Sequence, residues 1–423
     1  PFELTKDQRL AILDIEKDIT SKYPMNRLIQ GDVGCGKSIV GIYAILAMFS
    51  AGYQSLLMLP TEILAIQQYN SLLTYFKNYG VNVSILTSST KKRERDKILE
   101  DLRLGKINCL VGTHSLLNDE VKPYNLGLVV IDEQHKFGVN QRKSLIEKYR
   151  DVDAIYLTAT PIPRTLGLTV FGDLDITSIK TMPEGRKIVN TKIVPFSKLN
   201  GLIKFLKQRI LLGEQAYVVC PLIVENDDFD AIPVEEAKEI FDRELDGIKI
   251  DTIHGRISSD RKKEIMDSFM NNETKVLIST TVIEVGVNNP RATIMIILDA
   301  NRFGLAQIHQ LRGRVGRSDL QSYCALVTKK ENNERLIALE NINDGFGIAD
   351  ADFKLRGPGN YFGEEQSGFI ALEYADFETD YKIWEYAKSD ALAYLDDYLK
   401  GKEKSFRFDK ILLDNEKVGF KSN

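Results

Sequence analysis

The chain has 423 residues, of which 43% are hydrophobic and 27% charged, and its formal net charge is -4 at pH 7. Its length is too great for one hydrophobic core and predicts two or three domains of ordinary globular composition. The slightly acidic balance gives no sign of a nucleic-acid binder but does not exclude one, because binding grooves are built from local basic patches.

Cysteine usage and hydropathy exclude further classes of protein. The cysteines are widely spaced and are Cys35, Cys109, Cys220 and Cys324. This spacing argues against zinc and disulfide frameworks and predicts reduced thiols in a cytosolic protein. No apolar run is long enough for a membrane span, and no signal peptide is seen. The sequence starts with Pro1 rather than Met, so we expect a fragment of a longer protein.

The first element expected is an amphipathic helix over residues 6–20, with Thr5 as its N-cap. Gln8 could pair with the N6/N7 edge of adenine, and the ring of Phe2 could stack on the base. Alone, these residues are better explained as a capped surface helix with a core phenylalanine. The phosphate-binding pattern at residues 31–38 makes adenine recognition the better interpretation of Gln8.

The most informative stretch reads Gly31-Asp32-Val33-Gly34-Cys35-Gly36-Lys37-Ser38 and fits G-x-x-x-x-G-K-[ST], a phosphate-binding loop. Gly31, Gly34 and Gly36 let the backbone curl so that its N–H groups face a phosphate at a helix N-terminus. We expect Lys37 to reach the β- and γ-phosphates of ATP and the Ser38 hydroxyl to hold Mg²⁺. The alternative is a glycine-rich turn that matches by chance, and the order strand, loop, helix argues against it.

Threonines stand at the ends of three expected apolar strands and are Thr61, Thr113, Thr158 and Thr160. In open α/β sheets, ligands bind beyond the carboxyl ends of the strands. Thr61 and Thr113 could therefore donate to the phosphates of a second ligand, with simple helix caps as the alternative. Thr158 and Thr160 could bond to Glu133 or His135 and sense the nucleotide state, with turn-forming threonines as the alternative.

The apolar run 126–131 is followed directly by two carboxylates, Asp132 and Glu133. A continuous apolar run predicts a central parallel strand that is covered on both faces. A buried strand rarely ends in two acids without a reason, because burying charge is costly. With a phosphate loop upstream, we interpret Asp132 as a Mg²⁺ ligand and Glu133 as the base that activates the attacking water.

Residues 181–187 combine Pro, Gly and charge without periodicity and are typical of a linker. A second alternation of strands and helices follows, with strands expected at 216–221, 248–253, 275–280 and 293–298 and helices at 234–244 and 260–271. This alternation predicts a second parallel sheet. The second half contains no phosphate loop, so we expect one nucleotide bound between the two sheets.

The second half supplies positive charge in the segment Gln310-Leu311-Arg312-Gly313-Arg314-Val315-Gly316-Arg317. We expect its three arginines at the start of a helix or in a tight loop. Arginine suits the charge on a transferring phosphoryl group because its planar fork is always ionised. In isolation, a basic surface patch or a nucleic-acid contact explains the segment better. Together with the phosphate loop, it is interpreted as arginine fingers acting in cis.

The remaining chain changes character. Residues 331–343 are expected to be helical, residues 344–368 are rich in glycine and charge, and residues 376–400 form an acidic amphipathic helix. The four histidines have no metal-ligand spacing, which argues against a zinc site and favours neutral hydrogen-bonding roles; they are His114, His135, His254 and His309.

Taken together, the motifs resemble those of superfamily 2 helicases and, within them, the RecG branch-migration helicases. The resemblance runs from Phe2 to about Phe369 and is carried by residues 31–38, 60–62, 112–114, 132–139, 158–164, 254–256, 280–286 and 304–317. It implies an α/β fold with two RecA-like parallel-sheet domains of the P-loop NTPase type and a small, mostly helical C-terminal domain. The implied boundaries are residues 1–184, 185–330 and 331–423.

The resemblance also implies roles for matching residues. The ATP–Mg²⁺ site would comprise Lys37, Ser38, Asp132 and Glu133, and Gly286 belongs to a nucleotide-contacting motif. Gln310, Arg314 and Arg317 would approach the γ-phosphate from the second domain. DNA-binding or coupling roles fall on Thr61, Thr113, His135, Thr158, Thr160, Thr280, Arg356 and Gln366. The chain departs from the family pattern at Asn288, where aspartate is usual, and at Asn360, where glutamate is usual.

The implied activity is that of an ATP-dependent double-stranded DNA translocase. Such a motor remodels stalled replication forks and branch-migrates Holliday junctions in recombination and repair, as a monomer in the bacterial cytoplasm. Residues 344–368 resemble the element that turns motor closure into movement on the duplex. RecG proteins also carry an N-terminal wedge domain, and the chain starts directly at the adenine-reading motif.

Three alternatives remain open from the sequence. A transcription–repair coupling translocase shares this motor, although Gln134, His309 and Pro358 favour RecG. A wedge-less fragment could be a DNA-stimulated ATPase that binds DNA without unwinding it. An RNA helicase has similar motor motifs, but residues 344–368 are not expected there.

Overall fold

The computed structural model describes residues 3–133, 148, 152–161, 174–183, 187–221, 232–255, 257–280, 289–330, 332–356 and 381–400. The chain divides into two compact units. The first consists of Pro1–Pro161 and Asp173–Asp352, and the second of Ile162–Gly172 and Phe353–Asn423. The first unit contains two parallel sheets, and we name the residues around them the first lobe (up to residue 183) and the second lobe (from residue 187).

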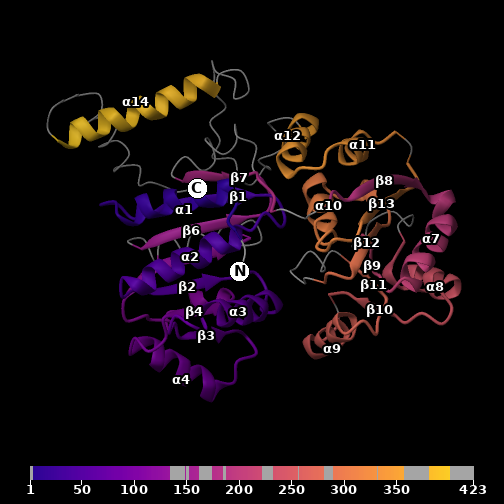
Figure 1. Cartoon of the computed structure of the whole chain (residues 1–423), viewed down its shortest axis with the longest axis horizontal. Helices are drawn as coiled ribbons and strands as arrows, with labels where there is room; N and C mark the ends of the chain where they lie inside the picture. The colour runs from indigo at the N-terminus through magenta and orange to yellow at the C-terminus, as the bar shows by residue number, and fades with distance from the viewer. Residues whose placement is uncertain are drawn as a thin grey trace. The chain divides into compact units, whose positions relative to one another are not determined.

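The first lobe is built on a seven-stranded parallel sheet in the order β3-β4-β2-β5-β6-β1-β7, which Figure 1 shows from β3 at its lower edge to β7 at its upper edge. The strands are β1 (Asn26–Gly31), β2 (Gln54–Met58), β3 (Val83–Leu86), β4 (Cys109–Gly112), β5 (Leu126–Asp132), β6 (Asp153–Thr158) and β7 (Asp175–Ile179). The helices are α1 (Lys6–Ile19), α2 (Lys37–Ser50), α3 (Glu62–Phe76) and α4 (Lys92–Arg103). All strands run in one direction, so their carboxyl ends share one edge, where ligands bind in such sheets.

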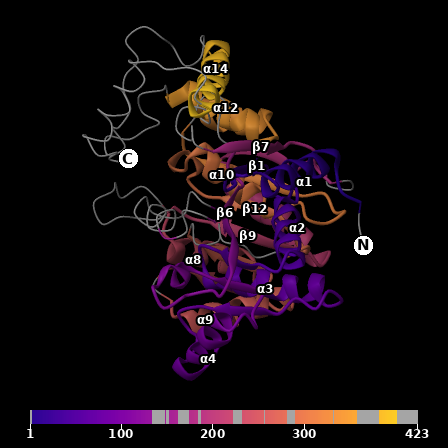
Figure 2. The same cartoon turned by 90° about the vertical axis from the view of Figure 1, so that its left-hand side faces the viewer.

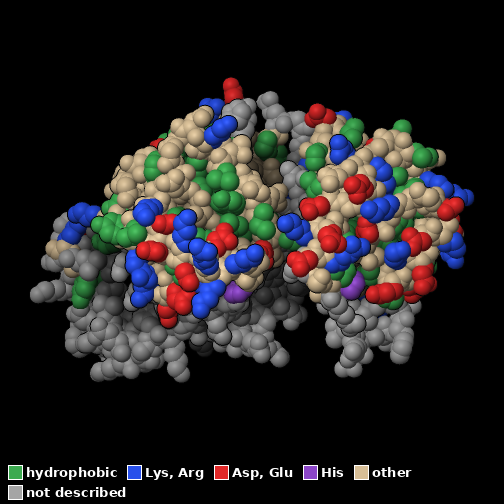
Figure 3. Space-filling view, turned by 90° about the horizontal axis from the view of Figure 1, so that it is seen from below, with side chains coloured by type: hydrophobic (Ala, Val, Ile, Leu, Met, Phe, Trp, Pro, Cys, Tyr) green, Lys and Arg blue, Asp and Glu red, His purple; other side chains and the backbone are tan. Residues whose placement is uncertain are grey.

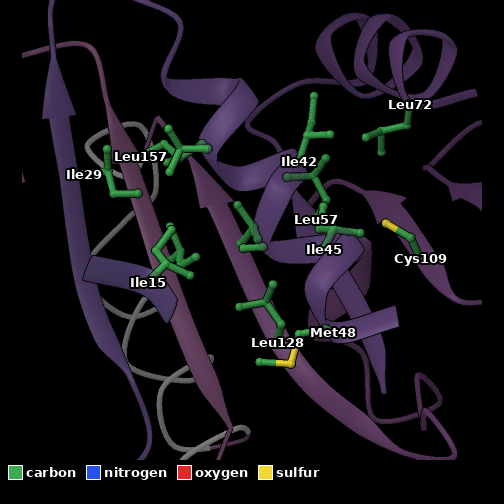
Figure 4. Close-up of a cluster of buried hydrophobic side chains, with 14 of the residues drawn as sticks. Ile15, Ile29, Ile42, Ile45, Met48, Leu57, Leu72, Cys109, Leu128 and Leu157 are labelled. Atoms are coloured by element: carbon green, nitrogen blue, oxygen red, sulfur yellow. The ribbon is translucent and has the colours of Figure 1, made fainter. Parts of the chain in front are cut away.

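A cluster of aliphatic side chains fixes α1, α2 and α3 to this sheet (Figure 4). Ile15, Ile45 and Leu72 from the three helices are at most 1% exposed and meet strand residues such as Leu128 and Leu157. Burying each of these side chains stabilises the fold by about 1.5–3 kcal/mol. The core therefore holds the start of α2, and with it the loop that precedes α2, at the carboxyl edge of the sheet.

The second lobe is a six-stranded parallel sheet in the order β10-β11-β9-β12-β13-β8. Its strands are β8 (Asn190–Pro195), β9 (Gln215–Val219), β10 (Ile250–Ile253), β11 (Val276–Ser279), β12 (Ala292–Ile297) and β13 (Tyr323–Thr328). Its helices are α7 (Leu199–Leu211), α8 (Val234–Glu244), α9 (Ser259–Met270), α10 (Leu305–Arg312) and α11 (Glu334–Asn341). Successive residues of β9 enter two different cores, Tyr217 on the side of α9 and α10 and Val218 on the side of α7 and α8. Helices therefore cover both faces, as the apolar strands predict.

Two more helices follow. Helix α12 (Gly345–Arg356) begins in the first unit and ends in the second, and α14 (Tyr381–Leu399) is a straight helix of the second unit (Figures 1 and 2). Within the described part of the chain, no helix combines the length and the apolar character needed to cross a membrane.

The structure confirms the predicted fold class of two parallel-sheet α/β domains. The helix expected over residues 6–20 and the carboxylate-tipped strand at 126–131 lie where they were predicted. The strands β3, β7, β8 and β13 were not predicted; β3 is short and β7 and β8 are interrupted by polar residues, whereas the apolar β13 has no such feature. Of the two placements expected for the arginine segment, the start of a helix is wrong, because α10 ends at Arg312, and a turn follows that contains Arg314. The proposed domain boundaries stay a prediction.

Candidate active site

The phosphate-type loop connects β1 to α2 and depends on its glycines. Gly34 and Gly36 both have φ of +81°, a region that L-residues with side chains rarely adopt. A Cβ on Gly36 would lie 2.3 Å from Nε2 of Gln8, and one on Gly31 would lie 2.7 Å from a backbone oxygen of β7. The loop is therefore a close-fitting backbone cradle at the N-terminus of α2, where unpaired N–H groups favour an anion.

Lys37, the first residue of α2, lies inside this cradle and is 8% exposed. Its Nζ donates hydrogen bonds to the carbonyl oxygens of Gly31 at 2.8 Å and Asp32 at 2.9 Å. A phosphate would be a stronger partner for the ammonium than these neutral carbonyls, because charge-assisted hydrogen bonds are roughly twice as strong as neutral ones. Ser38 follows in the first turn of the same helix.

Asp132 and Glu133 end β5 at the same edge of the sheet. Strand β6 lies between β5 and β1, with Leu157 opposite Asp132, so the backbones of β5 and β1 are two strand spacings, about 10 Å, apart. Burial and the charge of Glu133 raise the pKa of Asp132, while the nearby charge of Lys37 acts to lower it. Glu133 has φ of +53°, a conformation that costs a non-glycine residue on the order of 1 kcal/mol and marks many functional sites.

The end of β6 meets Glu133 through its backbone. The N–H of Ala159 donates to Oε2 of Glu133 at 3.4 Å. The hydroxyls of Thr158 and Thr160 bond to each other at 2.9 Å. The segment expected to sense the nucleotide therefore touches the candidate base, and His135, the other expected partner, lies outside the described residues.

Gln8 is bonded to the phosphate-type loop. Its Oε1 accepts from the N–H of Thr5 at 3.0 Å, which completes a capping box, and its Nε2 donates to the carbonyl of Cys35 at 2.8 Å. The side chain is 3% exposed. In this position the amide holds α1 against the loop, and its contact with adenine stays a prediction. Phe2 and Gly286, also expected near the nucleotide, lie outside the described residues.

The arginine segment of the second lobe lies directly against this loop. A Cβ on Gly313 would be 2.6 Å from Cβ of Val33, so the Val33 side chain packs on the glycine and leaves no room for a methyl group. The charge of the next residue, Arg314, acts to lower the pKa of Asp132. The guanidinium of Arg317 donates from Nε to the carbonyl of Gly313 at 3.4 Å. The described first unit therefore brings the positive segment and the carboxylates to one place.

The remaining residues of that segment are buried. Gln310, on α10, is 5% exposed. Arg312 points away from the carboxylates and donates to the carbonyls of Leu339, Ile342 and Asn343 at 2.9–3.0 Å. Arg312 therefore anchors residues 339–343, at the end of α11 and just after it, and the approach of Gln310, Arg314 and Arg317 to the γ-phosphate stays a prediction. A basic residue at a helix C-terminus often binds nearby carbonyls, and this signal could have identified Arg312.

The threonines expected to contact DNA lie at carboxyl ends of strands. Thr61 caps α3 by accepting from the N–H of Leu64 at 3.5 Å, and Thr113 is 4% exposed and lies 3.5 Å from the Ser115 hydroxyl. Thr280 is 6% exposed, and its hydroxyl makes no hydrogen bond to the part of the chain that the structure describes. Arg356 ends α12, but its side chain and all of Gln366 lie outside the described residues. The described face in Figure 3 intermixes basic and acidic side chains, so its charge alone does not indicate nucleic acid.

Comparisons with known proteins match this architecture. Residues 5–168 match the DEAD/DEAH box helicase family, and residues 197–319 match the helicase conserved C-terminal domain. Solved structures of yeast Dbp5 bound to RNA and ADP BeF3 share the fold at 14% identity, with TM-scores of 0.55 and 0.56. The fold and the phosphate-type loop thus match the two-lobed architecture of these helicase families.

More specific matches are with RecG helicases. Residues 342–409 match the C-terminal part of domain 3 of the ATP-dependent DNA helicase RecG. The RecG of Bacillus subtilis is 45% identical over 431 residues, covering 99% of this chain and 63% of the relative. The RecG of Thermotoga maritima is 45% identical over 394 residues, covering 92% and 50%. A solved structure of RecG bound to a three-way DNA junction has a TM-score of 0.75 at 42% identity, covering 91% of this chain and 51% of that one.

Over nearly its whole length the chain is similar to RecG ATP-dependent DNA helicases. It spans between 50% and 63% of the length of these relatives. The matches favour RecG over the transcription–repair coupling translocase.

Proposed function

We propose that the chain is an ATP-driven motor that moves along double-stranded DNA and remodels branched DNA such as forks and Holliday junctions. The observation that carries the proposal is the contact of Gly313 with Val33, because it puts the arginine segment of one lobe on the phosphate-type loop of the other. Motors of this kind need a nucleotide site that is completed only when two lobes meet.

Residues of both lobes have separate roles in the proposed hydrolysis of ATP. Lys37 and the N–H groups of the loop bind the β- and γ-phosphates, and Glu133 orients and deprotonates the attacking water. Arg314, Arg317 and Gln310 stabilise the charge that develops on the γ-phosphoryl group. Ser38 and Asp132 would hold Mg²⁺, which supplies charge neutralisation on the phosphate oxygens. The glycine cradle, the buried lysine and the nearby carboxylates fit such a group.

The DNA partner is inferred from the relatives. A RecG that is 42% identical over most of this chain has been solved on a three-way DNA junction, which supports branched duplex DNA as the ligand. We assign DNA contact or coupling to Thr61, Thr113, Thr158, Thr160 and Thr280, and coupling also to His135, Arg356 and Gln366. A monomer acting in the cytoplasm of a bacterium fits this assignment.

The test compares duplex DNA, forked DNA and RNA as activators of ATP hydrolysis and measures displacement of a triplex-forming strand in parallel. We expect stimulation by duplex and forked DNA, little stimulation by RNA, and displacement that requires ATP. Stimulation by RNA alone would contradict the assignment. DNA-stimulated hydrolysis without displacement would instead support a nucleotide-gated DNA-binding ATPase.

A further inference from the structure

Asp32, the second residue of the phosphate-type loop, binds groups from both lobes through its carboxylate. Oδ1 accepts from the N–H of Val33 at 2.6 Å and from Nε2 of His309 at 2.5 Å, and Oδ2 accepts from the N–H of Gly345 at 2.9 Å. The residue is 5% exposed. Burial acts to raise the pKa of Asp32, but the hydrogen bond from His309 and those from the two N–H groups hold it below its usual value. An ionised carboxylate therefore sits where three donors from three elements meet.

The direction of each hydrogen bond in this group can be assigned. A guanidinium has only donors, so Nδ1 of His309 accepts from Arg312 at 2.8 Å. The Nε2 of the ring therefore carries the proton that it donates to Asp32. Arg312 also holds the carbonyls of Ile342 and Asn343, directly before α12. The chain of bonds thus runs from the loop to the turn that precedes α12.

Asp32 also reaches α12 directly. Gly345 is the first residue of α12, so the carboxylate lies at a helix N-terminus, where negative charge is favoured. A Cβ on Gly345 would lie 2.8 Å from Nε2 of His309 and 3.2 Å from Oδ1 of Asp32, so only glycine fits without movement. An adjacent cavity of about 420 Å³ is lined by Asp32, Val33, His309, Arg312, Asn343 and Phe346, among other residues.

The backbone of Asp32 is bonded to the lysine that would bind nucleotide. Its carbonyl accepts from Nζ of Lys37 at 2.9 Å. A phosphate that draws the ammonium toward itself weakens this bond and releases one side of the residue. The carboxylate on the other side holds His309 and Gly345. Asp32 therefore contacts the proposed nucleotide-binding lysine through its backbone and α12 through its side chain.

We infer that Asp32 and His309 are positioning residues that transmit the nucleotide state of the phosphate-type loop to α12. The inference rests on the proposed function, since it assumes that Lys37 binds the phosphates of ATP. Coupling of this kind requires an element whose two states are biased from both sites. The Asp32–His309–Gly345 contact is that element. It is closed when Lys37 donates to the loop carbonyls and open when a phosphate takes the place of those carbonyls.

The test uses the chain with Asp32→Asn, with His309→Ala, and with both changes. Asparagine keeps the size of the side chain but removes its charge and one acceptor oxygen. The His309→Ala chain keeps the three bonds from Arg312 to backbone carbonyls, so the turn before α12 stays anchored. Asp153→Asn is the matched control, because Asp153 accepts the N–H of Met25 at 2.6 Å within the first lobe.

The main readout is hydrogen exchange of residues 342–348 with and without Mg²⁺ and a non-hydrolysable ATP analogue. In the unaltered chain we expect the nucleotide to change exchange at Gly345 by about fivefold or more, a typical allosteric coupling. Asp32→Asn and His309→Ala should lose this response, nucleotide affinity should rise by no more than about the same factor because coupling is reciprocal, and the double change should be no worse than either. DNA moved per ATP should fall in the same variants, and Asp153→Asn should behave as the unaltered chain.

Two results would overturn the inference. One is a nucleotide response at Gly345 that survives in both single variants, and the other is a double variant whose losses multiply as independent sites do. If the unaltered chain hydrolyses ATP without moving DNA, the proposed motor fails, yet the exchange measurement still decides the inference. If Asp32→Asn does not fold, His309→Ala alone gives the answer.

Discussion

The two lobes share one topology but carry different chemistry. Read from one edge, β3-β4-β2-β5-β6-β1 of the first sheet corresponds in order to β10-β11-β9-β12-β13-β8 of the second. By this correspondence β1 matches β8. The strand β1 continues into the glycine cradle and α2, whereas β8 continues into the short turn Phe196–Lys198 and α7. That turn contains no glycine, so β8 is not followed by an equivalent cradle for phosphate.

The acids at the ends of the central strands differ in the same way. Asp132 and Glu133 end β5, and Asp299 follows the corresponding strand β12. Both Glu133 and Asp299 adopt positive φ, at +53° and +48°. However, Asp299 accepts the N–H of Ile232 at 3.0 Å and so serves the second lobe's own structure. The comparison shows that the two sheets place acids at corresponding strand ends. The residues of the loops determine whether such an acid belongs to a functional site.

The largest expected effect comes from the lysine that only the first lobe has at this position. Lys37→Ala removes the side chain that we propose reaches both phosphates, so ATP turnover should fall about a thousandfold or more. Lys198→Ala alters the lysine that follows β8 and should leave turnover unchanged. Steady-state phosphate release with saturating duplex DNA measures both. Turnover that survived in Lys37→Ala would remove the functional distinction between the lobes.

The contribution of the second lobe is tested by Arg317→Ala. The change removes positive charge from the γ-phosphoryl group in the transition state, so kcat should fall by a factor on the order of a thousand. Binding of a fluorescent ATP analogue should persist, because the loop and Lys37 are intact. Arg335→Ala, in α11 of the same lobe, is the control and should change neither quantity. Normal hydrolysis by Arg317→Ala would show that turnover does not need this arginine of the second lobe.

A smaller effect is expected where the two lobes touch. Gly313→Ala adds a methyl group 2.6 Å from Cβ of Val33 and should push the arginine segment off the loop. A displacement of about 1 Å near a reacting centre can cost on the order of a hundredfold in kcat. Gly201→Ala in α7 meets nothing within 4 Å and should leave kcat unchanged while stabilising the helix by about 0.5–1 kcal/mol. Equal kcat in the two variants would mean that the contact is not used in turnover.

Local signals in the sequence were enough to predict the first lobe's candidate site. The loop pattern, the flanking apolar strand and the paired acids after β5 are each contiguous, so Lys37, Ser38, Asp132 and Glu133 could be placed on one sheet edge before any coordinates. Edge strands were missed because β7 (Asp175–Ile179) alternates polar residues and β8 ends in Pro195. The contact of Asp32 with His309 joins residues 277 positions apart, and nothing local to either residue indicates the other.

The smallest effect should appear in the second lobe, at Asp299, which corresponds in position to Asp132 and Glu133. Asp299→Ala leaves the buried N–H of Ile232 without its acceptor and puts alanine in a left-handed conformation, so unfolding should become easier by about 1–3 kcal/mol. No step of hydrolysis uses this carboxylate, so kcat should stay within about twofold at a temperature where the lobe is folded. Denaturant melts followed together with ATP turnover separate the two outcomes.

Asp299→Asn is the control, because asparagine tolerates the left-handed region and keeps an acceptor oxygen, and it should recover most of the lost stability. A large fall in kcat for Asp299→Ala with an unchanged melt would mean that both lobes use the acid after the central strand for chemistry, and the contrast between them would then be wrong at this position.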